Sequence, residues 1–175
     1  MSKKVIFLDR DGVINQEKNY LHKIEDFKFI NGIFDSLRTI QDLGYHFIVI
    51  TNQSGIGRGL YSEEDYLLLD KWMKKEFEKN GVKILFSIHC PHIPEQKCDC
   101  RKPKPGMFIN CFKLFKISKD DSWMVGDSER DIEAAIMAGI NKTILVRSGH
   151  PISESTTKAS IVVDSIKDIK KIITF

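Results

Sequence analysis

Two carboxylates two positions apart, Asp9 and Asp11, follow directly on an apolar run from Val5 to Leu8, and Gly12 comes next. A short apolar run of this kind is typical of a buried strand in a parallel sheet. Open α/β sheets bind their ligands at the carboxyl ends of such strands. Two acids there can bind a hard cation through oxygen or divide nucleophilic and acid–base roles between them. Taken alone, the segment is explained equally well as an acidic turn that uses the glycine.

A third acid, Asp127, lies just beyond another apolar segment, Trp123 to Val125. Distant strand ends can converge on one crevice in a sheet of this kind, which would bring the three acids together. Their charges would repel one another unless a cation lay between them, and an oxygen-only site suits Mg²⁺. Asp131 could support this site from the first turn of a helix, or could be an ordinary acid at a helix start.

A glycine-rich segment, Thr51 to Gly59, follows a further apolar strand. The Thr51 hydroxyl, the Asn52 amide and backbone N–H groups could hold a phosphate. The segment is not a usual P-loop, because it does not end in Gly-Lys-Ser/Thr. A plain glycine-rich loop without a ligand is the alternative.

Three cysteines and a histidine crowd one short loop. They offer four ligands for tetrahedral zinc, namely Cys90, His92, Cys98 and Cys100. Because protein fills all four positions, the zinc is expected to be structural rather than catalytic. Buried free thiols or a redox pair at Cys98 and Cys100 are the alternatives, and Cys111 is expected to be a core residue.

A basic run, Arg101 to Pro105, comes immediately after the last of these cysteines. A loop fixed by zinc would hold these cations in place, where they could balance phosphate charge beside the acids. The alternative interpretation is a solvated basic turn.

Strand-like and helix-like segments alternate, which predicts an α/β fold with a doubly wound parallel sheet. The expected strands span residues 5–8, 47–50, 84–88, 123–125, 143–146 and 161–163. The expected helices span residues 33–43, 62–79, 108–115 and 132–138, with a short helix closing the chain. Residues 149–158 are expected to form a surface loop. Four histidines without a companion pattern are interpreted as packing or surface residues: His22, His46, His89 and His150.

Length and composition favour one domain over residues 1–175, with 42% hydrophobic residues to form a core. No stretch approaches the ~20 apolar residues of a membrane span, and the first apolar run is too short for a secretory signal. We therefore expect a cytoplasmic protein without membrane contact. The net charge of +3 does not indicate a nucleic-acid surface.

Together these segments resemble the haloacid dehalogenase superfamily. Asp9-Arg10-Asp11-Gly12 resembles its first motif, Thr51-Asn52 its second, Lys102 its motif lysine, and Gly126 to Asp131 its acidic fourth motif. Within the superfamily, the glycine-rich segment, the zinc loop and the run from Arg101 to Met107 resemble the heptose bisphosphate phosphatases. The resemblance covers residues 4 to 150.

The resemblance implies a Mg²⁺-dependent phosphatase that acts on a small sugar bisphosphate through an aspartyl-phosphate. Asp9 would be the nucleophile and Asp11 the acid and base, while Thr51 and Lys102 would steady the phosphoryl group. Mg²⁺ would be held by Asp9, the backbone carbonyl of Asp11, and Asp127. Arg101 would recognise the distal part of the substrate. The other implied substrate contacts are Gly12, Glu17, Lys18, Asn19, Tyr20, Asn52, Gln53, Ser54, Arg58 and Ser128.

Three other readings remain open. Histidinol-phosphate phosphatases share the Cys-Pro-His and Cys-Asp-Cys loop but usually lack the Ser-Gly-Ile-Gly-Arg-Gly continuation. Polynucleotide 3′-phosphatases share that continuation but lack the zinc loop. A non-catalytic zinc-loop interaction module would not need both Asp9 and Asp11. Segments 12–32 and 51–62 are too short for a separate cap domain, so we expect an open site. The protein is also expected to be a monomer.

Overall fold

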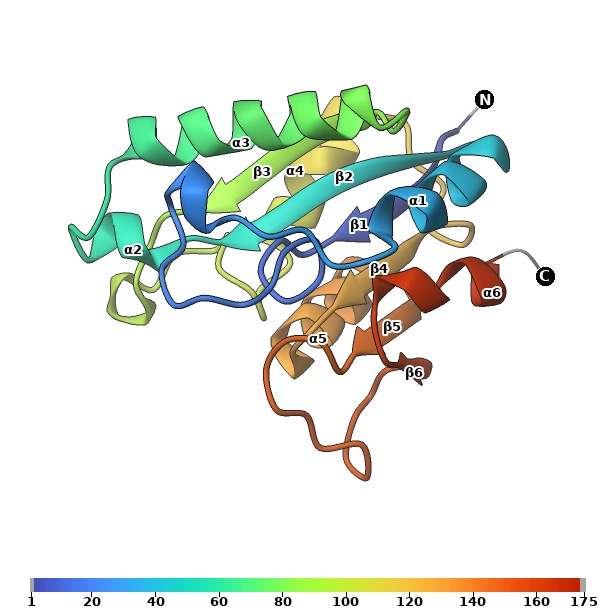
Figure 1. Ribbon diagram of the computed structural model, residues 1–175. Coiled ribbons are helices and arrows are strands. Elements are labelled where there is room, and N and C mark those ends of the chain that lie inside the picture. Colours follow the sequence, from blue (N-terminus) through green and yellow to red (C-terminus); the bar gives the residue numbers. More distant parts are fainter. Residues whose placement is uncertain (1, 174–175) are drawn as a thin grey trace.

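A computed structural model describes residues 2–173 and contains a six-stranded parallel sheet in the order β3-β2-β1-β4-β5-β6 (Figure 1). The strands are β1 (Lys4–Leu8), β2 (Tyr45–Asn52), β3 (Ile84–Cys90), β4 (Trp123–Gly126), β5 (Lys142–Val146) and β6 (Ile161–Val163). In the centre, Leu8 of β1 pairs with Val49 of β2 on one side and Val125 of β4 on the other. The predicted doubly wound parallel α/β class is confirmed.

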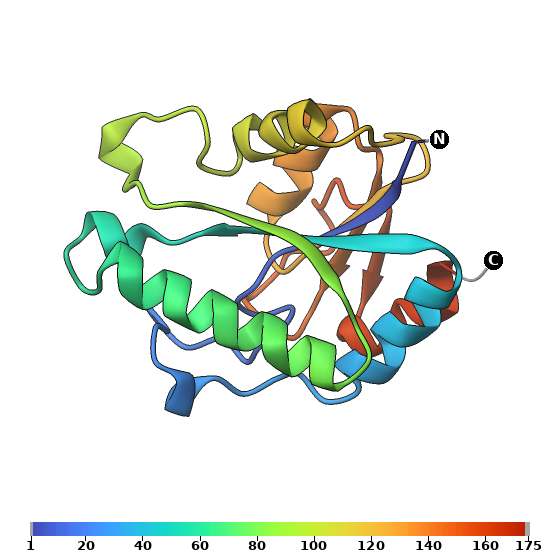
Figure 2. The same cartoon turned by 90° about the horizontal axis from the view of Figure 1, so that it is seen from above.

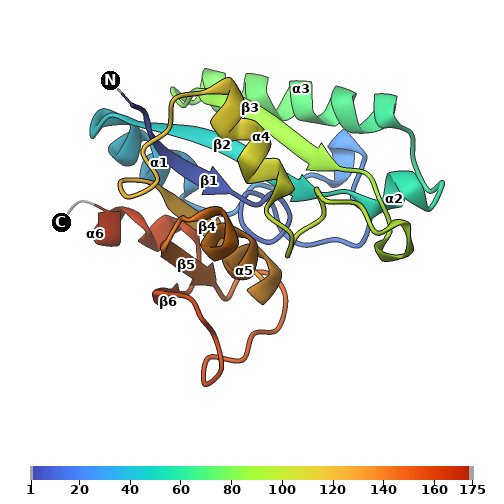
Figure 3. The same cartoon turned by 180° about the vertical axis from the view of Figure 1, so that it is seen from behind.

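Helices cover both faces of the sheet (Figure 2). One face carries α1 (Ile33–Asp42), α3 (Glu63–Lys79) and α6 (Lys170–Ile173), and the other carries α4 (Gly106–Leu114) and α5 (Glu129–Ala138), which lie side by side in Figure 3. Alternate residues of a strand point to opposite faces. Ile6 and Leu8 accordingly pack in the hydrophobic core under α1, α3 and α6. Val5 and Phe7 pack in the core on the opposite face, under α4 and α5. Burial on both sides explains why β1 reads as an unbroken apolar run.

The predicted elements form, and most differ from the prediction only at their ends: β2 is longer at both ends, α4 begins at Gly106 and α5 begins at Glu129. Residues 54–57, expected to be loop, form a short helix, α2 (Ser54–Gly57), and β3 extends to Cys90. Small side chains make this helix possible, because a Cβ on Gly55 would collide with the Tyr61 ring. The Gly57 N–H also donates to the Pro91 carbonyl at 2.9 Å, which ties α2 to the start of the cysteine-rich loop.

All strands run in the same direction, so their carboxyl ends meet at one edge of the sheet. Three short 3-10 turns complete the described chain: η1 (Ile24–Asp26), η2 (Pro94–Gln96) and η3 (Ile166–Asp168). Between β1 and α1 the described residues form η1 and isolated β-bridges, and between β2 and α3 they form α2. Neither segment covers the edge with a domain of its own. Over residues 2–173, no helix is long and apolar enough to cross a membrane.

Candidate active site

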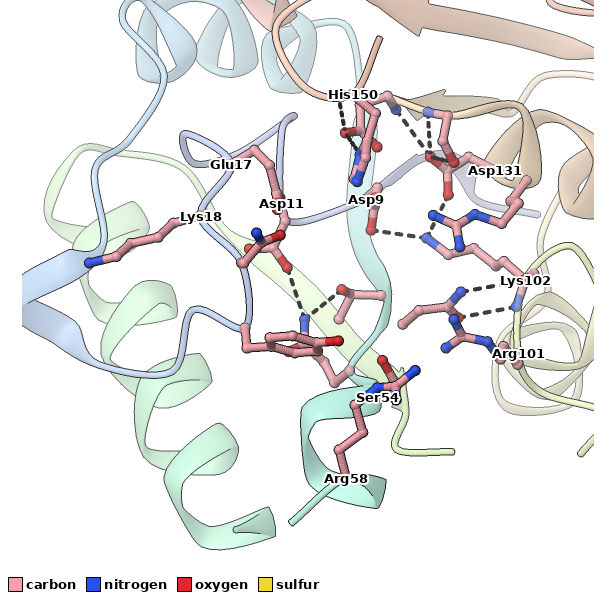
Figure 4. A pocket seen from close by; sticks show the side chains of 18 of the residues that line it. Asp9, Asp11, Glu17, Lys18, Ser54, Arg58, Arg101, Lys102, Asp131 and His150 are labelled. Atoms are coloured by element: carbon pink, nitrogen blue, oxygen red, sulfur yellow. Dashed lines mark hydrogen bonds and ion pairs between the residues drawn. The ribbon is translucent and has the colours of Figure 1, made fainter. Parts of the chain in front are cut away.

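A pocket of about 260 Å³ opens at the carboxyl edge of the sheet (Figure 4). The predicted site residues that line it are Asp9, Asp11, Glu17, Lys18, Asn19, Tyr20, Thr51, Asn52, Gln53, Ser54, Arg58, Arg101, Lys102, Asp127 and Ser128. Gly12 is the predicted substrate contact outside this lining, and it packs behind Asp127 instead. Four further residues line the pocket: Tyr61, Arg130, Asp131 and His150. The structure thus brings together side chains that lie far apart in the sequence, from Asp9 to His150.

Three carboxylates form the floor of this pocket. Oxygens of Asp9, Asp127 and Asp131 lie within 4.8 Å of one another. Burial raises the pKa of Asp9 well above its ordinary value, and the Asp131 charge raises it further. Burial and the same neighbouring charge also raise the pKa of Asp127. Clustered carboxylate oxygens are the donors that hard divalent cations prefer, so this set fits Mg²⁺.

The loop after β1 can approach the floor because position 12 is a glycine. Gly12 has a φ of +81°, a left-handed conformation that costs glycine little. A Cβ here would lie 2.8 Å from the Gly149 Cα and would also collide with the Asp127 carboxylate. Gly12 therefore lets two distant loops close around Asp127.

Lys102 neutralises part of the acidic floor. Its side chain is only 2% exposed, and its Nζ lies 2.9 Å from Asp9 Oδ1 and 2.7 Å from Asp131 Oδ1. Burial lowers the pKa of Lys102, but the charges of Asp131 and Asp9 outweigh burial and raise it above the ordinary value. The Asn52 amide accepts from the Lys102 N–H and donates to the Lys102 carbonyl, both at 3.1 Å. Asn52 thus fixes the backbone that presents the ammonium group.

Asp11 is held apart from the floor by a separate set of donors. Arg10, 2% exposed, donates from Nε and Nη2 to Asp11 Oδ1 at 3.2 and 3.0 Å. The Gln53 Nε2 donates to Asp11 Oδ2 at 3.1 Å and to the Thr51 hydroxyl at 2.9 Å. The Tyr61 hydroxyl donates to Gln53 Oε1 at 2.6 Å, which fixes the orientation of that amide. The pocket thus contains two carboxylates, Asp9 and Asp11, in different surroundings.

His150, predicted from sequence to be a packing or surface residue, is 45% exposed and lies at the surface, but it also lines the pocket and contacts Asp127. Its Nδ1 lies 2.6 Å from Asp127 Oδ2, and its backbone N–H donates to the same oxygen at 3.0 Å. Burial lowers the pKa of His150, but the hydrogen bond and charge of Asp127 raise it overall. The loop after β5 makes this contact, and no local pattern around His150 signals it.

The four predicted zinc ligands lie together at the end of β3 and on the loop that follows it. Separations between neighbouring ligand atoms run from 3.1 Å for the Sγ atoms of Cys90 and Cys100 to 3.6 Å for those of Cys90 and Cys98. Four ligands at the usual zinc distances lie about 3.4–3.8 Å apart around a tetrahedron. The group therefore fits zinc, with His92 Nδ1 as the nitrogen ligand, 3.3 Å from the Cys100 Sγ.

The arrangement of the sheet and the pocket defines a phosphatase of the haloacid dehalogenase class. A family model described as HAD-hydrolase-like matches residues 99–169. A D-glycero-alpha-D-manno-heptose-1,7-bisphosphate 7-phosphatase from Photorhabdus laumondii is 48% identical, over 97% of this chain and 96% of that protein. A D-glycero-beta-D-manno-heptose-1,7-bisphosphate 7-phosphatase from Vibrio cholerae is 45% identical, over 97% and 95%. The chain belongs to the D-glycero-D-manno-heptose-1,7-bisphosphate 7-phosphatase family.

A solved structure extends this similarity to three dimensions. The crystal structure of a D,D-heptose 1,7-bisphosphate phosphatase from B. bronchiseptica, complexed with magnesium and phosphate, superposes with a TM-score of 0.85. The two chains are 28% identical, and the match covers 98% of each.

Proposed function

We propose that this phosphatase removes the 7-phosphate of D-glycero-D-manno-heptose 1,7-bisphosphate, in the synthesis of nucleotide-activated heptose for lipopolysaccharide or other surface glycans. The observation that carries the proposal is the near-full-length identity of 48% and 45% to relatives named for this reaction. The names of these two relatives differ in the anomer, alpha in one and beta in the other.

Asp9 is the proposed nucleophile. Within residues 2–173 its Oδ1 pairs with Lys102, whereas its Oδ2 accepts no hydrogen bond. That oxygen attacks phosphorus, and the bond between phosphorus and the sugar oxygen breaks to give an aspartyl-phosphate. Protonated Asp11 gives its proton to the departing sugar oxygen. Asp11 then takes a proton from water, which attacks phosphorus and releases phosphate and Asp9.

The cations around Asp9 hold the group that is transferred. We propose that the Lys102 ammonium and the Thr51 hydroxyl bind phosphoryl oxygens, whose charge they offset in a buried setting. Asp9, the backbone carbonyl of Asp11, and Asp127 would hold Mg²⁺, which supplies positive charge beside the phosphoryl oxygens when bound. Asp131 supports this arrangement, because it pairs with Lys102 and accepts from the Asp127 N–H at 3.1 Å.

The remaining predicted residues divide between contact and support. We propose that side chains on the rim contact the sugar and its distal phosphate: Glu17, Lys18, Asn19, Tyr20, Ser54, Arg58, Arg101 and Ser128. Gly12, Asn52 and Gln53 act through their neighbours, because they shape the loop, hold Lys102 and hold Asp11 respectively. Zn²⁺ on Cys90, His92, Cys98 and Cys100 would stabilise the loop that carries Arg101.

Four further points stay predictions. They are a single domain over residues 1–175, a cytoplasmic location, a monomeric state, and the absence of nucleic-acid or membrane partners. The absence of a cap segment in the described residues 2–173 supports the first of them.

The test is a phosphate-release comparison with Mg²⁺. It includes both anomers of the heptose bisphosphate, fructose 1,6-bisphosphate, histidinol phosphate and a 3′-phosphorylated oligonucleotide. We expect kcat/KM to be highest for one heptose bisphosphate anomer. A higher kcat/KM for histidinol phosphate or for the oligonucleotide would overturn the proposed substrate.

A further inference from the structure

Three arginines from separate parts of the chain line the same pocket. Arg58 follows α2, Arg101 follows the zinc-ligand loop, and Arg130 lies in the first turn of α5. Arg101 and Arg130 also line a second hollow, beside the pocket and against the zinc loop, so these two side chains are neighbours.

No acid in the described chain balances these three charges. Over residues 2–173, neither Arg58 nor Arg130 forms an ion pair, and the Arg101 guanidinium donates only to the His92 carbonyl, at 3.1 Å. Each of the chain's other arginines forms an ion pair with an acid: Arg10 with Asp11, Arg38 with Asp35, and Arg147 with Glu154.

The acids nearest to Arg130 in sequence are occupied elsewhere. Glu129 accepts from the Thr157 hydroxyl and the Lys158 N–H, each at 2.7 Å. Asp131 pairs with Lys102. Like charges held together without a counter-ion repel one another, so this grouping favours the binding of an anion from outside the chain.

We infer that Arg130 is a specificity-determining residue that binds the second phosphate of the substrate together with Arg101. The inference rests on the proposed function, in which the first phosphate is attacked by Asp9 at the acidic floor. A guanidinium can donate two parallel hydrogen bonds to a phosphate, which gives strength and orientation. Arg130 is the one basic residue of α5, and the helix gives its backbone a fixed position at the rim.

The experiment compares a sugar with one phosphate and the same sugar with two. Wild type is expected to prefer heptose 1,7-bisphosphate to heptose 7-phosphate in kcat/KM. Arg130→Gln is expected to reduce that preference about 10- to 100-fold, because it removes a pair of charge-assisted hydrogen bonds to the phosphate. Arg130→Lys keeps the charge without the planar fork and should retain part of the preference. Weaker inhibition by heptose 1-phosphate, which carries only the distal group, is expected in Arg130→Gln.

Arg38→Gln is the matched control. It removes one exposed arginine charge from α1, where Nη1 donates to the Asn80 carbonyl at the end of α3, away from the pocket. The control should keep the wild-type preference.

The inference is overturned if Arg130→Gln lowers kcat/KM equally for both sugars, or leaves kcat/KM unchanged for both. It is also overturned if wild type shows no preference for any bisphosphate. Failure of the proposed function is a different result. A preference for fructose 1,6-bisphosphate over fructose 6-phosphate that depends on Arg130, without heptose hydrolysis, would overturn the proposed heptose substrate and support the role of Arg130.

Discussion

At the level of single residues, Asp9 and Asp11 differ in their partners rather than in their chemistry. Asp9 is buried between Lys102 and two further acids, with one oxygen free of hydrogen bonds from residues 2–173. Asp11 accepts from Arg10, Asn15 and Gln53, so its orientation is fixed by the protein. These surroundings support the proposed division of roles, in which Asp9 attacks phosphorus and Asp11 transfers the proton.

Replacing Asp9 by Asn should abolish turnover while the fold persists. The change preserves shape but removes the charge that attacks phosphorus, so we expect phosphate release to fall at least ~1,000-fold. The Tm should stay level or rise, because a buried carboxylate among other acids is costly. Phosphate release and thermal unfolding measure the two effects. Release within tenfold of wild type would contradict the nucleophilic role of Asp9.

The Tyr61 hydroxyl offers a finer test of how Asp11 is positioned. Tyr61→Phe removes the 2.6 Å hydrogen bond to Gln53, so the amide loses the contact that fixes its orientation toward Asp11. We expect kcat for the sugar phosphate to fall about 3- to 10-fold, the value of one hydrogen bond. The fall should be smaller for p-nitrophenyl phosphate, whose leaving group needs no proton from Asp11.

Tyr66→Phe is the control for that substitution. Tyr66 is also buried, but its hydroxyl has no hydrogen-bond partner, so its removal should leave both rates unchanged. Equal losses on the two substrates in Tyr61→Phe would point to a general packing defect and contradict the positioning role.

At the level of elements, the short helix α2 and the loop after β3 support each other. The Gly57 N–H donates to the Pro91 carbonyl, and the Gln53 N–H donates to the Cys90 carbonyl at 2.8 Å. The same loop carries Arg101 and Lys102 into the pocket. Fixing the cysteine loop therefore fixes cations that the proposed chemistry needs.

Cys98→Ser should lower zinc content, stability and affinity together. A structural zinc supplies folding free energy, and we expect the Tm to fall by about 5–15 °C for a chain of this size. KM for the bisphosphate should rise, because Arg101 is anchored to the loop through the His92 carbonyl. Elemental analysis, thermal unfolding and kinetics measure these effects.

Cys111→Ala is the matched control for Cys98→Ser. It removes a buried thiol in α4 that lies outside the ligand group, so one zinc per chain should remain. Full zinc content in dialysed Cys98→Ser would refute the ligand assignment.

Most elements could be predicted from sequence because their signals are local. Apolar runs mark the strands, and Ser62 and Asp65 form the capping box that starts α3. The convergence of the acids also follows, since parallel strands end at one edge. The pocket positions of Tyr61, Arg130 and His150 could not be predicted in this way, because each depends on how a loop or helix start returns to the edge. His150 contacts Asp127 from a loop that packs closely there, since a Cβ on Gly12 or on Gly149 would collide with the Asp127 carboxylate.

At the level of the whole molecule, the sheet gathers carboxylates at a buried edge where their charges oppose folding. Asp9 follows β1, Asp127 follows β4 and Asp131 lies in α5, so the repulsion acts only once the chain is folded. Lys102 offsets part of it. A divalent cation bound to the folded chain should therefore stabilise the whole fold as well as serve the reaction.

Mg²⁺ should raise the Tm of the wild-type protein. A ligand at 100 times its Kd stabilises the folded state by about 2.7 kcal/mol, which corresponds to a rise of about 5–10 °C for a chain of this size. Asp127→Asn removes one charge from the floor, so its Tm without Mg²⁺ should be no lower than that of wild type, and the Mg²⁺-dependent rise should be small. Thermal unfolding over a Mg²⁺ titration gives both values. An identical Mg²⁺-dependent rise in Asp127→Asn would place the cation elsewhere, because Asp127 would then contribute nothing to its binding.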